Sequence, residues 1–448
     1  MSRMFSGSIA VALLLAVPAI AWAAPEPTQS QLDPLSLTQA QQLALRNHPA
    51  LSAQGFRAQA AGEDVNVAKS TLYPQLYGSA NRVFAGANTR VTAVPGALND
   101  PTVLARGSAG LSLSQLITDF GRQSDLIAAS ELTLKSEQDR VDSVRDATLF
   151  RATAAYYDVL RSQALLIVAQ GTVKSRATLY DQVTRLRSAK LKSDLDVSFA
   201  KLGVDQANLL QIRAESGLDD AWARLAEALG LNSVTHFALS TGLPATMPPL
   251  DAREAATDQA LARNPDLQAR EASRDSAHQQ AEADAKAGYP TISAGGFVGA
   301  NPFRESDQRL SSNYAAGGIV ITIPLYTGGR LTAQERRSGF AARAADRDVD
   351  AARNTLVRDV QVAWDSANTA YRNIAVTDQL LASSTQALDL TRARYDIGSS
   401  SIVDVEQAEV AALEAKIAQS NAKYDYLTER AFLAYREGGN AIGAEDGE

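Results

Sequence analysis

The sequence predicts a mainly α-helical chain with a small β part, built from two similar halves. Two helical patterns, at about 122–187 and 330–398, contain no proline and are far longer than a typical helix of three or four turns. A short run of alternating apolar and polar residues precedes each pattern and ends in a Gly-Arg pair. The two pairs are Gly121-Arg122 and Gly329-Arg330. A strand that continues into a very long helix, twice in one chain, therefore organises the rest of the sequence.

The chain has 448 residues, a net charge of -7 and a pI near 5.3. This acidic balance argues against a nucleic-acid partner, because phosphate backbones are bound by basic surfaces. The absence of cysteine excludes disulfides and thiolate metal sites. His48, His236 and His278 are dispersed along the chain and lack metal-ligand spacing. We therefore expect no metal and no cofactor.

Export is predicted by residues 1–23, which read as a signal peptide. Arg3 supplies a positive start, residues 9–20 form an apolar run, and Ala21-Trp22-Ala23 fits a signal-peptidase site. The run is shorter than the ~20 residues of a membrane helix, which disfavours an uncleaved anchor. No later segment reaches that length without charges, so membrane insertion would have to use β-strands.

The first half, residues 24–230, is expected to begin with a helix that a proline interrupts. Its pattern starts at Leu37, with Ser36 or Thr38 as the N-cap, and Pro49 should break or kink it. The period then changes to two, which indicates a β-hairpin with a long tip loop. The expected bounds are 51–69 for the resumed helix, about 73–118 for the hairpin, 86–101 for its loop, about 122–187 and 194–229 for the long helix pair, and 188–193 for the turn within it. At 1.5 Å per residue the first long helix would span ~100 Å.

The second half, residues 251–437, repeats this order after a proline-containing connector at 231–250. The halves match at two constant offsets, as expected for a duplicated segment with one internal deletion. The matched pairs are Pro49 with Pro265 and Pro74 with Pro290, 216 apart, and Gly121 with Gly329 and Asp196 with Asp404, 208 apart. The expected bounds are about 289–326 for the second hairpin, with its loop near 301–312, and about 330–437 for the second long helix pair. The Gly-rich acidic tail, 438–448, is expected to be disordered.

A heptad pattern along the second long helix predicts a coiled-coil seam. Its positions are Leu356, Val360, Ala363, Ala367, Ala370, Ile374, Thr377, Leu381, Ser384, Leu388, Thr391 and Tyr395, and a second stripe is formed by Val357, Trp364 and Tyr371. A solid antiparallel bundle would leave the hairpins without a role. Four strands cannot close a barrel, for which about eight are needed, and open strand edges in lipid would leave backbone groups unpaired. We therefore expect several copies to pool their hairpins and helices.

Taken in order, these features resemble the TolC family of outer-membrane efflux proteins. The resemblance rests on the duplicated helix, Tyr-Pro, hairpin, Gly-Arg, long-helix order and on the segment RYDIGSSSIVDV at 394–405. It implies a homotrimer with four strands per subunit in a 12-stranded outer-membrane β-barrel, continued by a long coiled-coil α-barrel in the periplasm. It also implies a passive exit duct of a tripartite efflux pump or type I secretion system in a Gram-negative bacterium. The implied partners are outer-membrane lipid, a periplasmic adaptor (membrane fusion protein) and an inner-membrane transporter of the RND, ABC or MFS type, with no catalysis by the duct.

The resemblance also implies a gate at the periplasmic end, pinned by polar links around the helix–helix turns. The matching positions are Asp196, Tyr395 and Asp404. Ser400 stands where the best-known members carry an arginine, and Gln407 replaces the second acidic residue of the constriction. Alternative roles remain open at this point. Tyr395 also fits a seam position, and both aspartates fit helix N-caps or first-turn positions.

The turns of the two long helix pairs would be the adaptor-docking tips. Their residues are Lys190, Lys192, Gly398, Ser399 and Ser400, and a solvated turn is the alternative for the lysines. The junctions Gly121, Arg122, Gly329 and Arg330 would be the points where barrel passes into tunnel. Asp119-Phe120-Gly121 spells a kinase motif, but no other kinase element accompanies it, so it reads as a turn. A periplasmic coiled-coil adaptor or scaffold is the competing function, and no catalytic constellation supports an enzyme.

Overall fold

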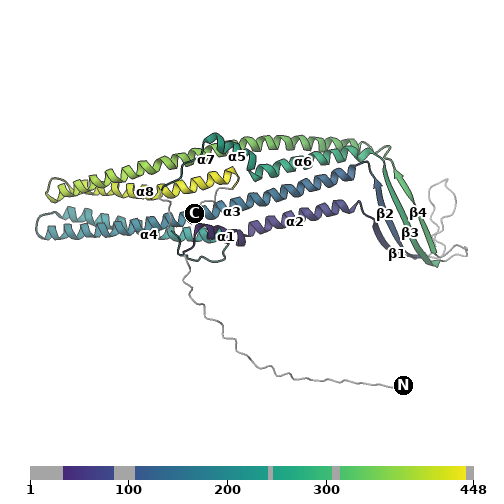
Figure 1. The fold of residues 1–448 in the computed structure, drawn as a ribbon. Helices are drawn as coiled ribbons and strands as arrows, with labels where there is room; N and C mark the ends of the chain where they lie inside the picture. Colours follow the sequence, from purple (N-terminus) through teal and green to yellow (C-terminus); the bar gives the residue numbers. More distant parts are fainter. Residues whose placement is uncertain (1–33, 85–105, 241–245, 305–312, 440–448) are drawn as a thin grey trace, which may run out of the picture.

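The computed structural model describes residues 34–84, 106–240, 246–304 and 313–439. Long helices lie side by side along most of the molecule, and a small sheet extends from one end (Figure 1). The described elements are α1 (Leu37–Asn47), α2 (Pro49–Ser70), β1 (Gln75–Val83), β2 (Arg106–Thr118), α3 (Arg122–Ser188), α4 (Asp194–Ala228), α5 (Arg253–Arg263), α6 (Pro265–Ala285), a 3-10 turn η1 (Lys286–Gly288), β3 (Thr291–Arg304), β4 (Asn313–Thr322), α7 (Arg330–Asp396) and α8 (Ile402–Glu437). The prediction of a mainly α chain with a small β part is confirmed.

Proline and its preceding residue shape the short helices α1, α2, α5 and α6. Of the two candidate caps of α1, Ser36 is the one used, in a capping box with Gln39. α1 ends before Pro49, whose missing N–H is harmless at the first position of α2. His48 Nδ1 accepts a hydrogen bond from the Ala50 N–H at 3.3 Å, and Asn264 caps α6 from the equivalent place.

α3 and α7 each contain 67 residues and begin directly after a glycine in the left-handed backbone region. Gly121 has a φ of 94° and Gly329 a φ of 79°. Glycine adopts this conformation without the Cβ clash of other residues. The backbone can therefore change direction sharply at both glycines, between the strand and the helix. The kinase-like spelling at Asp119-Phe120-Gly121 belongs to this turn.

The sheet is antiparallel, with strand order β1-β2-β3-β4. β2 pairs with β3, which joins the two halves of the chain, and Gly110 lies opposite Gly299. Within the described strands, one edge of β1 and one edge of β4 have no neighbouring strand.

The second hairpin differs from its predicted bounds at two places. β3 continues to Arg304, into the segment predicted as loop, and β4 ends at Thr322 instead of approaching Tyr326. A register shift between Gly107 and Ala109 allows the extra strand length, because it leaves Asn301 and Pro302 outside the regular pairing. A bulge tolerates a proline, which cannot donate a ladder hydrogen bond, and sequence periodicity alone did not reveal it. The predicted loop 86–101, residues 305–312, the signal peptide and residues 440–448 lie outside the described residues.

The heptad seam of α7 is the buried face of that helix. Leu356, Val360, Ala363, Ala367 and Ala370 are at most 8% exposed. The seam positions from 374 to 391 are half-buried, and Tyr395 is again buried at 3%. The heptad prediction is therefore confirmed along the described helix.

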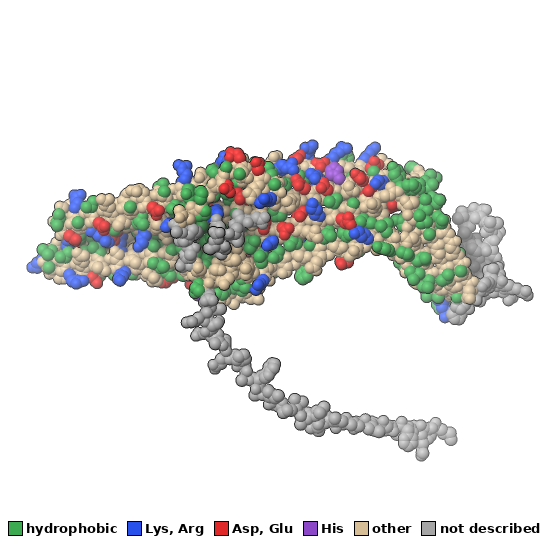
Figure 2. All heavy atoms as spheres, viewed as in Figure 1, with side chains coloured by type: hydrophobic (Ala, Val, Ile, Leu, Met, Phe, Trp, Pro, Cys, Tyr) green, Lys and Arg blue, Asp and Glu red, His purple; other side chains and the backbone are tan. Residues whose placement is uncertain are grey.

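Apolar side chains gather over the sheet, whereas charged side chains cover the helical part of the visible face (Figure 2). Leu111, Ile319 and Ile321 are examples on the strands, each about half exposed or more. Among the described residues, no helix combines the length and apolar composition of a membrane span.

Candidate functional site

The candidate site lies at the two helix–helix turns, at the end of the molecule opposite the sheet (Figure 1). Residues 189–193 connect α3 to α4, and residues 397–401 connect α7 to α8. Ser193 and Ser401 are the N-caps of α4 and α8, and each forms a capping box. The serine side chain binds the backbone N–H three residues on, and the aspartate at that position returns a bond to the serine N–H. The same local sequence therefore fixes both turns.

Asp196 and Asp404 are the acidic members of these two boxes. Asp196 Oδ2 accepts from the Ser193 N–H at 2.8 Å, and Asp404 Oδ2 accepts from the Ser401 N–H at 2.8 Å. Backbone and side-chain hydrogen bonds from Ser401 and Ser400 lower the pKa of Asp404. Partial burial raises the pKa of Asp196, but the Ser193 hydrogen bonds and the Lys192 charge outweigh it, and the net pKa is lowered. Both aspartates therefore occupy first-turn positions, whereas the N-caps themselves are Ser193 and Ser401. The lowered pKa values keep both carboxyl groups charged at neutral pH.

Tyr395 connects the α7 seam to the first turn. Its ring packs in an apolar cluster formed by Val183, Ala200, Ile402 and Val405. Its hydroxyl donates to Asp196 Oδ1 at 3.4 Å. Burial, reinforced by the Asp196 charge, raises the pKa of Tyr395 to about 12, so the hydroxyl remains a donor. Tyr395 therefore fills a seam position with its ring and forms the polar link with its hydroxyl.

Lys192 from the first turn completes this contact. Its ammonium lies 3.4 Å from the centroid of the Tyr395 ring and donates to the Tyr395 carbonyl oxygen at 3.2 Å. The sequence predicted Lys192 as an adaptor-docking residue, whereas in the structure its ammonium group contacts the Tyr395 ring. No sequence signal could have found this pairing, because the two residues are 203 positions apart and on different helix pairs.

The remaining turn residues have different surroundings. Lys190 and Ser399 are exposed, whereas the Ser400 hydroxyl donates to Asp404 Oδ2 at 2.8 Å. Leu191 and Ile397 project apolar side chains from the two turns and are 69% and 79% exposed. Exposed apolar and basic groups at the tips are suited to contacts with another protein.

Lys190 has a φ of 64°, in the left-handed region that Gly398 occupies in the other turn with a φ of 77°. The Lys190→Gly variant is expected to stabilise the protein by about 1 kcal/mol, because the Cβ clash is removed. Thermal unfolding of the purified protein measures this. The control is Ala189→Gly, whose φ of -79° contains no strain to relieve and which should destabilise. Equal shifts for both variants would contradict the strain interpretation.

The predicted junction residues lie at the other end of the helices and are not brought together with the turns. Beside them, Lys286 Nζ pairs with Asp125 Oδ2 at 2.5 Å, linking η1 to the start of α3. Gln123 is buried and donates from Nε2 to the Ala68 oxygen at 2.7 Å, which ties α3 to α2. These contacts anchor α3 where it leaves the sheet.

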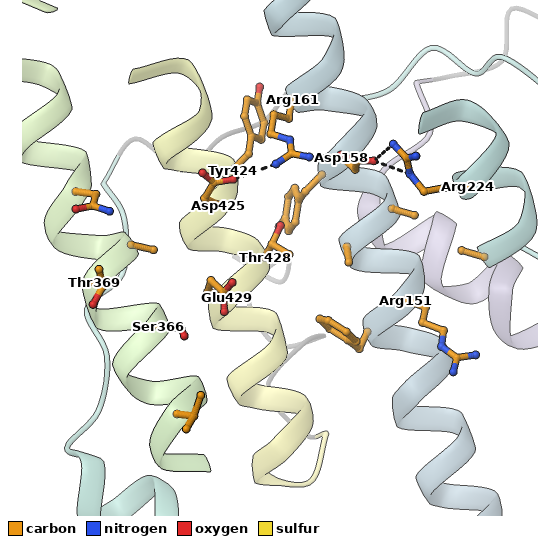
Figure 3. Close-up of a pocket in the computed structure, with 18 of the residues that line it drawn as sticks. Arg151, Asp158, Arg161, Arg224, Ser366, Thr369, Tyr424, Asp425, Thr428 and Glu429 are labelled. Atoms are coloured by element: carbon orange, nitrogen blue, oxygen red, sulfur yellow. Dashed lines mark hydrogen bonds and ion pairs between the residues drawn. The ribbon is translucent and has the colours of Figure 1, made fainter. Parts of the chain in front are cut away.

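A cavity of about 900 Å³ lies midway along the helices, between α3, α4, α7 and α8 (Figure 3). Arg161 pairs with Asp158 at 2.5 Å and Asp425 at 3.3 Å, and Arg224 pairs with Asp158 at 2.7 Å. This network ties α3 to α4 and α8. Burial raises the pKa of Glu429, which also lines the cavity, and the Asp425 charge adds to this.

A short four-stranded sheet at one end and paired long helical hairpins at the other are features of a class of outer-membrane channel subunits. The chain belongs to the outer membrane efflux protein family, which matches residues 40–231 and 256–436. It is 27% identical over 392 residues to the outer membrane protein TolC of Vibrio cholerae, with 86% of each chain covered. It is 26% identical to TolC of Escherichia coli, covering 88% of this chain and 80% of that protein. The crystal structure of a membrane protein from Pseudomonas aeruginosa, 23% identical, shares the fold with a TM-score of 0.77, covering 90% and 93% of the two chains.

The protein is thus an outer-membrane channel of a Gram-negative bacterium that extends into the periplasm. It serves as the exit duct of an efflux pump or a type I secretion system. This membership favours the duct over a periplasmic adaptor or scaffold, and the family is one of transport proteins.

Proposed function

We propose that three copies of this chain form one passive duct, closed at its periplasmic end by the helical tips. The observation that carries the gate is the contact of Lys192, Tyr395 and Asp196, which joins the α3–α4 turn to the end of α7. The contact needs the two helix pairs to lie together, so it stabilises a closed tip over an open one.

Two exposed features support assembly with further copies. The free edges of β1 and β4 expose backbone groups that neighbouring sheets would pair, giving twelve strands from three copies. Apolar stripes with heptad-compatible spacing are also exposed on α4 and α7. Their residues are Leu195, Leu202 and Leu209, exposed at 64%, 50% and 48%, and Val362, Val376 and Leu390, exposed at 58%, 64% and 60%. Such stripes become coiled-coil seams when a neighbouring helix covers them.

The tip surface supports docking of a periplasmic adaptor, which would connect the duct to an inner-membrane transporter of the RND, ABC or MFS type. Lys190, Gly398 and Ser399 are exposed there, beside the apolar side chains of Leu191 and Ile397. Lys192 is reassigned in this proposal from docking to the closed state of the gate. Outer-membrane lipid would contact the apolar sheet surface.

One Asp404 per subunit would place a ring of carboxylates at the tip opening, since the side chain is exposed and charged. The Asp404→Asn variant is expected to lower the preference of the channel for cations by about half or more, because it removes the charge but keeps an acceptor for Ser401. Reversal potentials in planar bilayers under a salt gradient measure this, together with conductance. Asp258→Asn, at an exposed position of α5 away from the tips, is the matched charge control. Unchanged selectivity and conductance in Asp404→Asn would refute the assignment.

A further inference from the structure

Four charged side chains meet where α3, α7 and α8 pack together near the tips. Arg176 of α3 donates to both Glu406 and Glu409 of α8, and its Nε lies 2.7 Å from Glu409 Oε2. Arg392 of α7 contacts the other oxygen of Glu409 at 2.8 Å. Glu409 is therefore shared between two arginines from the two halves of the chain.

Arg176 is the most deeply buried cation of the group. Its side chain is 5% exposed, as is that of Glu409, and the Glu406 side chain is 16% exposed, so both ion pairs are buried. Gly203 of α4 lies against the cluster, where an added Cβ would come within 3.1 Å of Arg176 Nη1. The α4 backbone thus covers the guanidinium, and all four helices of the tip surround it.

Glu406 is bound less completely than Glu409. Its Oε1 is buried and has no hydrogen-bond partner, and an added Cβ on Gly203 would lie 3.2 Å from that oxygen. Burial raises the pKa of Glu406 and the neighbouring Glu409 adds to this, although Arg176 opposes both. The two glutamates, three residues apart, are therefore bound differently. Glu409 bridges two arginines, whereas Glu406 pairs with Arg176 through one oxygen and has its other oxygen buried without a partner.

We propose that Arg176, Glu409 and Arg392 form a latch that holds the α7–α8 hairpin against the α3–α4 hairpin when the duct is closed, and that Glu406 weakens this latch so that it can release. The latch rests on the proposed gate and deepens it by adding a second, buried lock below the Lys192–Tyr395 contact. When the hairpins separate, water enters and hydrates the four charges. A buried ion pair is favourable only while its hydrogen-bonding geometry is intact. The latch is therefore either formed or broken, without stable intermediate arrangements.

The same Glu→Gln change at the two positions tests the latch. Glu409→Gln leaves Arg176 and Arg392 without their shared carboxylate. In planar bilayers, the occupancy of the high-conductance state of the assembled channel should therefore rise by roughly tenfold or more. Glu406→Gln removes the uncompensated charge and keeps an acceptor for Arg176, so occupancy should fall or stay at the wild-type value. Parallel rises in both variants, or no change in Glu409→Gln, would overturn the proposal.

Hydrogen exchange of the detergent-solubilised protein supplies a readout that does not depend on conduction. Glu409→Gln should speed exchange in peptides covering 388–412, with β2 unchanged as the folding control. If Glu409→Gln does not assemble, Arg392→Met provides the test, because Arg392 is 38% exposed and only one arm of the latch is lost. Wild-type exchange in Arg392→Met would then reject the latch. If exchange rises but conductance does not, the hairpin contact stands and the proposed gate fails.

Discussion

The Lys192→Met variant is expected to raise the conductance of the assembled channel several-fold by shifting the tip toward its open state. Methionine preserves most of the side-chain length but removes the ammonium from the Tyr395 ring and from the Tyr395 carbonyl. A cation–π contact of this kind contributes about 1–2 kcal/mol when partly desolvated. Because 1.4 kcal/mol corresponds to about tenfold in an equilibrium, the ratio of closed to open channels should fall by about one order of magnitude.

Single-channel recordings in planar bilayers measure this effect, and Lys190→Met is the matched control. Lys190 lies in the same turn and carries the same charge, but it is exposed and two residues before the one that contacts Tyr395. A double-mutant cycle with Tyr395→Leu isolates the pair, since the two changes should be far from additive if one contact carries both. Equal effects of Lys190→Met and Lys192→Met would assign the change to tip charge in general and contradict the lock.

The elements that the sequence predicted well are those with a local periodic signal. The α7 seam is one example, because a heptad repeat reports which face of a helix meets a neighbour wherever that neighbour comes from. Ser36, one of the two residues predicted to cap α1, is a second, since its capping box with Gln39 involves residues only three positions apart. Local spacing was sufficient in both cases.

Contacts between the two halves were not predictable from one sequence. Arg176 finds Glu406 and Glu409, and Lys192 finds Tyr395, only through the rotation and height at which the two helix pairs pack. Periodicity indicates which face of a helix is buried. It does not indicate which helix packs against that face, or how far the two helices are shifted along their axes. The bulge that extends β3 to Arg304 has the same origin, because it is set by pairing with β2 across the halves.

A glycine follows the last helix of each half, and the two glycines make equivalent contacts. Gly230 follows α4 with a φ of 68°, and Gly438 follows α8 with a φ of 106°. Each is followed by an N–H that returns to a helix carbonyl, from Leu231 to Ala226 at 2.9 Å and from Gly439 to Ala434 at 3.0 Å. Each glycine also presses against the residue that ends the first helix of its half: an added Cβ would lie 2.8 Å from the Asn47 backbone or 2.9 Å from that of Arg263.

Gly230→Ala and Gly438→Ala are therefore each expected to destabilise the protein by about 3 kcal/mol, combining the left-handed strain of an alanine with a collision against backbone. Backbone cannot move aside as a flexible side chain does. The end of α4 must therefore shift away from α1, or the end of α8 away from α5. Denaturant unfolding of the purified protein measures the loss. Gly217→Ala is the control, because Gly217 lies inside α4 with nothing within 4 Å of the added Cβ, and it should stabilise by up to about 1 kcal/mol. A mild effect at Gly230 with a large one at Gly438 would show that the two halves do not use this contact equally.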